Sequence, residues 1–298
     1  MGGTREIGQV KMDHSGDMGT MSSHTNERPA EGAEDTLILA VETSSRIGSA
    51  ALALGPGLVE EVRFSGPMQH SEEVFPTIDG LLRRHRYTPA DIDQIHIALG
   101  PGSFTGLRIA VTMAKVMNMA NAVRIVTVDS LDVVAANLSE APGGQIDTPD
   151  GKIPTPDRIA ALFDAKRGQF YASAYQWVVP GPEGSPRDNA EDSGYRIPGP
   201  DNGLWQKIAP DSLMTVQEII QKFAGHGPIA LLGDGLFYHR DKFAAEGALV
   251  LPERYWSPRA ANVYRLGYQK ALSGRFDDPL ALTPFYLRGP EVTLRKKS

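Results

Sequence analysis

Apolar residues in the first third of the chain fall into short runs separated by glycine- and proline-rich turns. Residues 37–41, 49–54 and 58–64 form three such runs, and the turn Gly55-Pro56-Gly57 separates the last two. Short apolar runs joined by tight turns are typical of neighbouring antiparallel strands. The pattern therefore predicts that the fold opens with three consecutive strands.

Helical spacing begins after these strands. Apolar positions recur every three or four residues from Val74 to Leu82, with Ser71 as a candidate N-cap, acidic residues in the first turn and a kink expected at Pro76. Alternating and apolar runs then predict strand 94–99, helix 105–120, strand 124–128 and helix 130–138. The resulting order is β-β-β-α-β-α-β-α, which predicts a mixed sheet, antiparallel first and parallel after the crossovers.

The second half of the chain repeats this order without repeating the sequence. The predicted elements are a hairpin of strands 159–164 and 169–177, strand 204–209, a helix opened by the capping box of Thr215 and Glu218, strand 229–232, helix 236–245, strand 248–251, and a last helix with Ser257 as N-cap and Pro258 at its first position. The sequence thus predicts an α/β protein of two lobes that face each other across a cleft.

Changes in composition and segments rich in proline, glycine and aspartate indicate the domain boundaries. We expect a disordered N-terminal tail over 1–35, a first lobe over 36–140, a linker over 141–157, and a second lobe over 158–298 with a surface insertion at 180–202. The chain of 298 residues has no cysteine and a net charge of −6, with 41% hydrophobic residues. These values argue against thiolate metal sites and a broad nucleic-acid surface, and with no apparent signal or membrane segment they predict a cytoplasmic protein.

The stretch Gly100-Pro101-Gly102-Ser103-Phe104-Thr105-Gly106-Leu107-Arg108 lies between a predicted strand and a predicted helix. A glycine turn at a helix N-terminus suits a phosphate or carboxylate, and it equally suits close packing of a helix on a strand. The Walker A, dinucleotide and nucleophile-elbow patterns all fail here, because Leu107 follows Gly106, Thr105 takes a glycine position and Pro101 precedes Gly102. Both interpretations stay open on local grounds.

The helix after this turn is apolar around most of its circumference, so it has to be covered on nearly every side. Its own domain covers part of it, and adaptable methionines favour a second chain on the rest. With the helix before it, it gives a predicted partner interface, which consists of Ser71, Val74, Phe75, Ile78, Leu82, Arg108, Val111, Thr112, Met113, Lys115, Val116 and Met119. Val111→Glu or Met113→Glu is expected to weaken partner binding, because each would bury an unpaired charge.

Several motifs resemble the TsaB family in order and spacing. They are Glu42-Thr43-Ser44, His70-Ser71-Glu72, the stretch 100–108, Asp164-Ala165-Lys166-Arg167-Gly168 and Pro284-Phe285-Tyr286-Leu287-Arg288. The string GPGSFTGLR is the most specific of these, and the resemblance runs from about residue 37 to residue 288. It implies an actin-like fold of two ribonuclease-H-like lobes.

The resemblance also implies a function. TsaB-like chains are catalytically silent scaffolds of tRNA threonylcarbamoyladenosine (t6A) synthesis that bind and support the TsaD transferase, joined by the ATPase TsaE. It implies a TsaD-like partner, a TsaE-like ATPase, contact with tRNA only through the complex, pairing of isolated chains through the same surface, and no membrane. It implies no catalytic residue and no metal, and the seven histidines never fall four apart, as a helical metal-binding pair would require.

Acidic and glycine turns of the actin-like superfamily face nucleotide phosphates, and the resemblance places the corresponding turns here. The candidate phosphate-facing residues are Thr43, Ser44, Gly100, Gly102, Ser103, Thr105, Gly106, Asp164, Lys166 and Arg167. Arg46 is bulky where a small residue is needed close to phosphate. Lys166 and Arg167 replace the small residues of a phosphate turn with long cations, which could bind phosphate, fill the cleft or project to solvent. We therefore expect no cofactor of the chain's own, and ATP or ADP only at the interface with the TsaD-like subunit.

Two other functions stay open. A stand-alone ATP-dependent kinase of the actin-like superfamily is motivated by the three turns at 42–48, 164–168 and 233–235. ATP hydrolysis by the lone chain would identify such a kinase. A peptidase acting on the partner would use Ser103 with His70 or His96, a coincidence of residue types without a geometry. After the failed phosphate motifs, the glycine turn is best interpreted as a device that sets its helix against the sheet and presents it to a partner.

Overall fold

The computed structural model describes residues 34–66, 69–140, 145–148, 151–179, 193, 195–199, 203–223, 229–245 and 248–288. All of them belong to one compact unit, Gly32–Ser298. Most of the predicted tail over 1–35 and of the predicted insertion over 180–202 lies outside the described residues, so both stay predictions.

The first sheet has five strands in the order β3-β2-β1-β4-β5. Their bounds are β1 Leu37–Glu42, β2 Ser49–Leu54, β3 Gly57–Arg63, β4 Gln94–Gly100 and β5 Arg124–Asp129. The first three strands pair antiparallel, and β1, β4 and β5 pair parallel. The predicted mixed sheet is confirmed.

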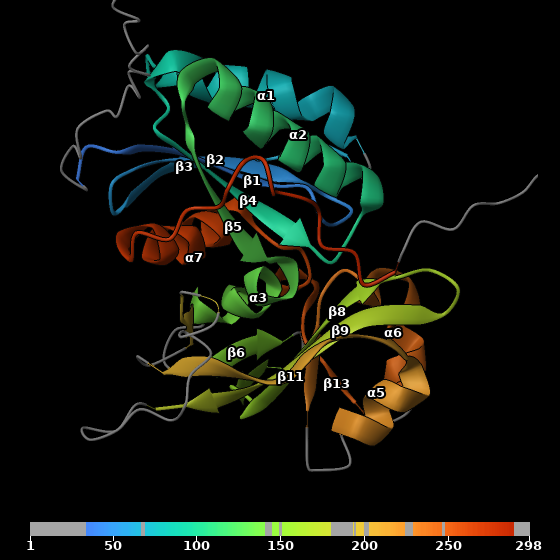
Figure 1. Cartoon of the computed structure of the whole chain (residues 1–298). Coiled ribbons are helices and arrows are strands. Elements are labelled where there is room, and N and C mark those ends of the chain that lie inside the picture. The colour runs from blue at the N-terminus through green and yellow to red at the C-terminus, as the bar shows by residue number, and fades with distance from the viewer. Residues whose placement is uncertain are drawn as a thin grey trace, which may run out of the picture. The chain divides into compact units, whose positions relative to one another are not determined.

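Helices cover both faces of the first sheet, which is why all six residues of β1 are buried. Helices α1 (His70–Arg84) and α2 (Phe104–Asn121) lie side by side on one face, and α7 (Ala260–Leu272) lies on the other (Figure 1). Helix α1 begins one residue before Ser71, so the predicted N-cap is wrong, and Gln69 takes that place. Ser103 caps α2 by accepting the N–H of Gly106.

The second sheet repeats this order with one added strand, β10-β11-β9-β8-β12-β13. Its strands are β8 Arg158–Asp164, β9 Gln169–Val178, β10 Ile197–Pro198, β11 Leu204–Thr215, β12 Ala230–Leu232 and β13 Leu249–Val250. Helices α5 (Val216–Phe223) and α6 (Leu236–Ala245) pack on it, and the predicted capping box of Thr215 and Glu218 is confirmed.

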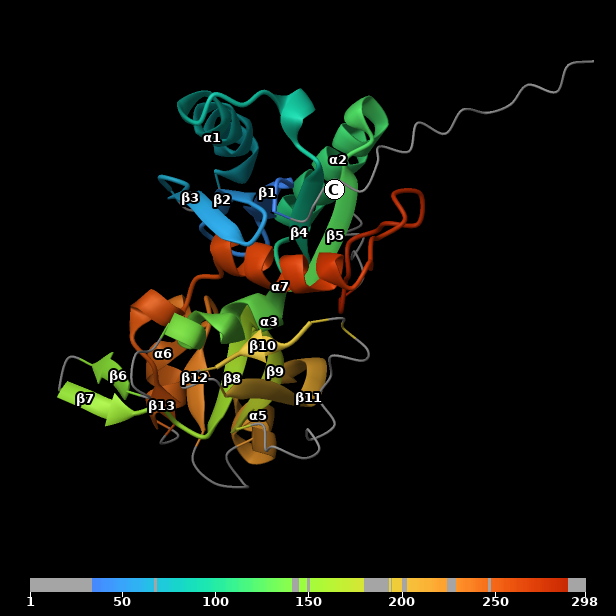
Figure 2. The same ribbon diagram turned by 90° about the vertical axis from the view of Figure 1, so that its left-hand side faces the viewer.

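The larger hydrophobic core lies between the two sheets. Helix α3 (Ser130–Ala135) and α7 both pass through it, one below the other (Figure 2), and α3 continues as a 3-10 helix over Ala136–Glu140. Helix α7 follows the second sheet in the sequence but packs on β1, β2, β4 and β5 of the first. The polypeptide therefore crosses back between the two sheets.

The start of α7 differs from the prediction. The helix begins at Ala260, after Arg259, rather than at Ser257 and Pro258. The first amides of α7 are bonded by distant residues: Ala260 N–H donates to Ser49 Oγ at 2.8 Å, and Ala261 N–H to Glu61 Oε1 at 3.0 Å. Because these acceptors replace a local cap, the helix has no need of Ser257.

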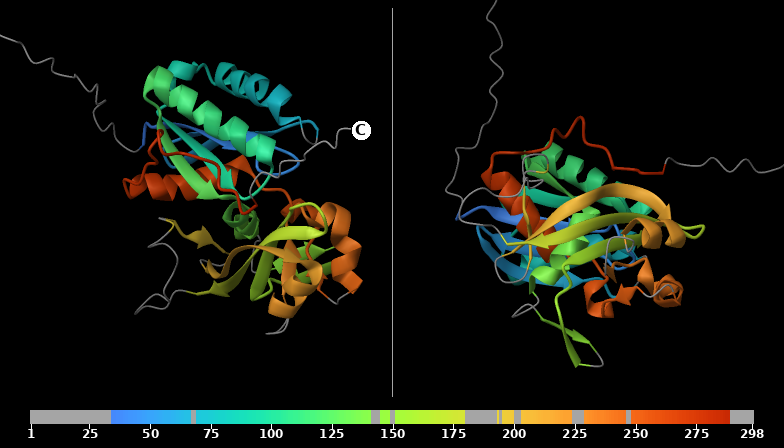
Figure 3. Two further views of the ribbon diagram at one scale, coloured as in Figure 1. Left: turned by 45° about the vertical axis from the view of Figure 1, so that its right-hand side comes forward. Right: turned by 90° about the horizontal axis from the view of Figure 1, so that it is seen from below.

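Two segments outside the sheets add structure that the sequence pattern does not predict. The predicted linker holds a hairpin of β6 (Gln145–Thr148) and β7 (Gly151–Pro154). The C-terminal segment runs beside β5 and β4 (red in Figure 3), where Asp277 N–H donates to Ile125 O and Phe285 N–H to Leu99 O. This segment thus covers the outer edge of β5.

Candidate functional site

An apolar groove of about 630 Å³ lies between α1 and α2. Seven residues of the predicted partner interface line it, namely Phe75, Ile78, Leu82, Arg108, Thr112, Met113 and Val116. Six further residues complete it, namely Pro89, Ile92, Phe104, Thr105, Ile109 and Met117. Phe75 and Val116 keep 59% and 57% of their surface exposed, although both are large and apolar. The groove therefore exposes a large apolar surface of the kind that is usually covered by a protein partner.

The other predicted interface residues do not line the groove. Val74 and Val111 lie in the core between the helices and the first sheet, whereas Ser71, Lys115 and Met119 lie outside the groove. Val111 and Met113 are buried, so a glutamate at either position would place a charge in the core. Phe75 and Val116 are the residues that test docking without first disturbing the fold.

The glycine turn packs tightly on the turn that follows β1. A Cβ on Gly102 would overlap the Ser44 carbonyl, and a Cβ on Gly106 would overlap the Thr43 carbonyl. Ser103 N–H donates to Ser44 O at 2.7 Å, and Thr43 Oγ donates to Gly106 O at 2.8 Å. The two turns thus hydrogen-bond to each other. This favours the interpretation that the glycines allow close packing of the helix on the strand.

A second cavity, of about 640 Å³, lies between the two sheets beside this turn, and we call it the cleft. Seven predicted phosphate-facing residues line it, namely Ser44, Gly102, Ser103, Thr105, Asp164, Lys166 and Arg167. Thr43 and Gly106 lie behind the lining, and Gly100 faces a different cavity. Phe104 and Thr105 line both the cleft and the groove, so the two sites adjoin each other.

Two buried carboxyls lie at the floor of the cleft, with Asp234 on its lining and Glu42 behind the lining. Asp234 accepts the N–H of Arg46 at 3.1 Å, and Glu42 accepts both the N–H and the hydroxyl of Ser44. Burial raises the pKa of Glu42 to about 7, and it does the same to Asp234. An anion placed on this floor would meet carboxyls that already hold the nearby amides.

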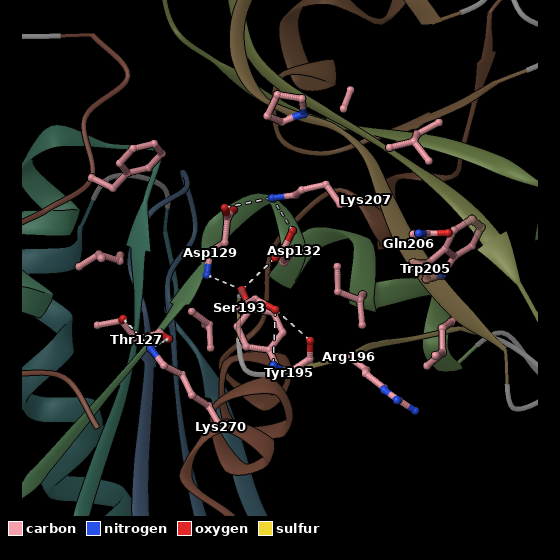
Figure 4. A pocket seen from close by; sticks show the side chains of 18 of the residues that line it. Thr127, Asp129, Asp132, Ser193, Tyr195, Arg196, Trp205, Gln206, Lys207 and Lys270 are labelled. Carbon is pink, nitrogen blue, oxygen red and sulfur yellow. Dashed lines mark hydrogen bonds and ion pairs between the residues drawn. The ribbon is translucent and has the colours of Figure 1, made fainter. Parts of the chain in front are cut away.

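A third cavity, of about 600 Å³, surrounds a buried cluster that the sequence pattern does not reveal (Figure 4). Lys207 lies 3.1 Å from Asp129 and 2.8 Å from Asp132, and Asp211 Oδ1 is 2.8 Å from the same ammonium. Burial works against the charged ammonium, but the three aspartates outweigh it and raise the pKa of Lys207. Burial also raises the pKa of Asp129 to about 7.

This cluster joins residues that are far apart in the chain. Tyr195 donates its hydroxyl to Asp132 at 2.8 Å and accepts the N–H of Asp129 at 3.1 Å (Figure 4). Tyr175 adds a second hydroxyl to Asp132. A lysine in a strand and two aspartates at a helix start give no local signal of one another, because only the pairing of the two halves brings them together.

The residues considered for a peptidase are engaged elsewhere. Ser103 Oγ accepts the N–H of Gly106, His70 bonds to the carbonyl of Ser45, and His96 bonds to Gln94 Oε1. Burial lowers the pKa of His96 to about 3. Across the described ranges, no group of three or more His, Asp or Glu side chains is arranged to hold a metal ion. None of the helices described here is long and apolar enough to span a membrane.

Comparison with known proteins identifies relatives along most of the chain. It is 27% identical to the tRNA threonylcarbamoyladenosine biosynthesis protein TsaB of Bacillus subtilis, over 86% of this chain and 95% of that protein. It is 23% identical to the protein of the same name from Escherichia coli, over 84% and 94% of the two chains. Over most of its length, this chain is similar to TsaB.

Two further comparisons agree with that relationship. Residues 67–180 match the family model described as TsaD, tRNA N6-adenosine threonylcarbamoyltransferase. The structure titled YeaZ from Pseudomonas aeruginosa superposes with a TM-score of 0.62 at 19% identity, over 85% of this chain and all of that one. The expected actin-like fold of two ribonuclease-H-like lobes is confirmed.

Proposed function

We propose that this chain is a non-catalytic subunit in the biosynthesis of tRNA N6-threonylcarbamoyladenosine and binds a TsaD-like transferase through the groove between α1 and α2. The names of its relatives support the pathway. The groove supports the binding of a protein partner at this place, because Phe75 and Val116 are large apolar residues that stay exposed along it.

The chemistry of the groove suits a pair of helices. The TsaD family model matches residues 67–180, a range that includes both α1 and α2. A TsaD-family protein is therefore expected to carry counterparts of these helices, and two such pairs can face each other about an approximate two-fold axis. A second copy of this chain fits the same arrangement, which is the symmetric case. We propose that the homodimer forms when the transferase is absent.

In this proposal the chain supports catalysis without performing it. The complex also takes up a TsaE-like ATPase, and tRNA is the substrate of the whole assembly. The chain has no cofactor of its own, and ATP or ADP would lie at the interface with the transferase. The internally bonded cleft floor supports this division of roles, since Ser44, Arg46 and Gly106 use their polar groups within the fold.

The experiment is a binding measurement with purified TsaD-like subunit. Val116→Glu and Phe75→Glu each place a charge in the apolar groove, and each is expected to weaken binding at least tenfold because that charge would be buried without a partner. Leu272→Glu is the matched control, since Leu272 is 60% exposed and lies on α7, on the opposite face of the first sheet. Isothermal titration calorimetry gives the dissociation constants.

Two results would contradict the proposal. One is binding of the groove variants as tight as that of Leu272→Glu. The other is metal-dependent transferase activity of the chain alone. Light scattering on the chain with and without the transferase tests the homodimer, which the same groove variants should dissociate.

A further inference from the structure

Positive charge collects at the mouth of the cleft, although the chain as a whole carries a net charge of −6. Four cations line this cavity, namely Arg46, Lys166, Arg167 and Arg288, against the two carboxylates of Asp164 and Asp234. Asp234 is buried at the floor, where its raised pKa reduces its charge. The mouth therefore presents a local positive potential on an acidic protein.

Two of these cations stand at the tip of the hairpin that joins β8 and β9. Lys166 and Arg167 are exposed, and the Lys166 side chain keeps 76% of its surface in solvent while its ammonium lies 2.7 Å from Asp164. Exposed cations on a hairpin tip can contact a polyanion that lies across the mouth of the cleft. A small ligand at the floor of the cleft would lie deeper than these two side chains.

The backbone of this tip is unusual for these residue types. Lys166 and Arg167 have φ values of +65° and +56°, followed by Gly168 at +72°. Glycine or asparagine adopts this left-handed region with little strain, and long side chains rarely do. The turn geometry alone would favour smaller residues, so it does not account for two adjacent cations.

An exposed aromatic ring lies beside one of these cations, Arg46. Tyr238 on α6 is 62% exposed, and the Arg46 guanidinium lies over its ring at 4.6 Å from the ring centroid. The same guanidinium lies 5.0 Å from the Phe237 ring, which holds Arg46 in place. An exposed aromatic face next to basic side chains is the combination that stacks an unpaired base and holds its phosphates.

We propose that the rim formed by Arg46, Lys166, Arg167 and Tyr238 binds a single-stranded or looped segment of RNA. Lys166 and Arg167 contact backbone phosphates, and Tyr238 stacks on a base. This adds a direct RNA contact to a chain for which the sequence predicts only an indirect one. The inference rests on the proposed function solely for the choice of tRNA as the source of the RNA.

The test uses the full-length chain and a fluorescently labelled tRNA anticodon stem-loop, with binding followed by anisotropy between about 50 and 200 mM salt. The double variant Lys166→Asn/Arg167→Asn removes two cations and keeps a residue type that tolerates the left-handed turn. Affinity at the lowest salt is expected to fall about tenfold. The slope of log K against log salt should fall by roughly 1.4, for two lost phosphate contacts.

The matched control is Arg83→Asn/Arg86→Asn at the end of α1. Both arginines are exposed, and Arg86 also has a positive φ, of +62°, so the control removes the same charge from a similar backbone. It should leave affinity and slope unchanged. Equal binding by the rim and control variants would overturn the proposal, and matching thermal unfolding curves for the two double variants would show that both are folded.

Two further measurements separate the base contact from the phosphates and RNA from nucleotide. Tyr238→Ala should weaken binding at least about fivefold with an unchanged salt slope, whereas Tyr238→Phe should bind like the wild type. If ADP displaces the RNA and its own binding falls equally in Lys166→Asn/Arg167→Asn, the rim is a nucleotide site and the proposal is wrong. Val116→Glu should lose the transferase but keep the RNA, so failure of the proposed function is recognised separately.

Discussion

The two sheets share one topology, yet the helices that cover them expose different chemistry. On the first sheet, α1 and α2 leave Phe75 and Val116 exposed along an apolar groove. On the second sheet, α6 buries Leu236 and Phe243 and shows Tyr238, Arg240 and Lys242 to solvent. The fold thus fixes where the helices lie, and their outward side chains decide what each half can bind.

The interiors differ in the same way. The core under α1 and α2 consists of aliphatic residues with one phenylalanine, Phe64, and one buried methionine, Met113. The larger core, which includes the second sheet, encloses the ammonium of Lys207 among three aspartates. An apolar core tolerates loss of one contact, whereas a buried charge cluster depends on every member. Three substitutions test how far this contrast goes.

Lys207→Met is expected to have the largest effect. It removes the positive charge that three buried carboxylates share, and breaking such a cluster costs about 4 kcal/mol of the free energy of unfolding. Urea denaturation at neutral pH measures this loss of unfolding free energy. The control is Asp79→Asn, which breaks the exposed Arg83–Asp79 pair on α1 and should cost less than about 0.5 kcal/mol. A loss below about 1 kcal/mol for Lys207→Met would contradict the dependence of this charge cluster on its lysine.

Gly106→Ala is expected to come next, at about 3 kcal/mol, because its Cβ would overlap the Thr43 carbonyl and force α2 off the sheet. Gly57→Ala is the matched control, since its Cβ would meet only the Leu54 carbonyl at 3.5 Å. Denaturation curves again give both values. If Gly106→Ala instead kept full stability, the turn would be free to serve a ligand, and the packing interpretation would fail.

The smallest effect concerns the pH dependence of stability. The pKa of Glu42 is raised to about 7, so the folded state holds a proton that the unfolded chain releases near pH 4.5. Protonated Glu42 therefore contributes to the free energy of unfolding at low pH. This contribution is lost as the pH rises from the unfolded to the folded pKa, by about 2 kcal/mol between about pH 5 and pH 7. Glu42→Gln should remove this part of the slope.

Glu73→Gln is the control for that measurement. Glu73 is bonded to Ser65 at the surface, and that hydrogen bond lowers its pKa, so it keeps one charge state across the same range. Denaturation at several pH values should give Glu73→Gln the slope of the wild type. An unchanged slope for Glu42→Gln would assign the pH dependence to the other carboxyls whose pKa burial raises, namely Asp129, Asp132 and Asp234.

Local patterns were sufficient for most elements. Strand β1 is a run of apolar residues buried on both faces, and α5 opens on the Thr215–Glu218 capping box that the sequence spells out. Seven residues of the predicted interface line the groove, because helical spacing places them on one side of α1 and α2. Some misses were local, such as the N-cap of α1 and the β6–β7 hairpin. The start of α7 was missed because its partners, Ser49 and Glu61, are far away in the chain.

Most strands and helices, the glycine turn and the surplus of apolar residues on α2 could be predicted, since each of these follows from neighbours close in the sequence. The crossing of α7 to the first sheet, the contacts of Lys207 with Asp129 and Asp132, and the contact of Arg46 with the Tyr238 ring could be found only in the folded molecule. Hydrogen bonds, ion pairs and ring contacts act over a few ångströms in space. Residues that are some 80 to 200 positions apart carry no local sign of one another until the sheets have formed.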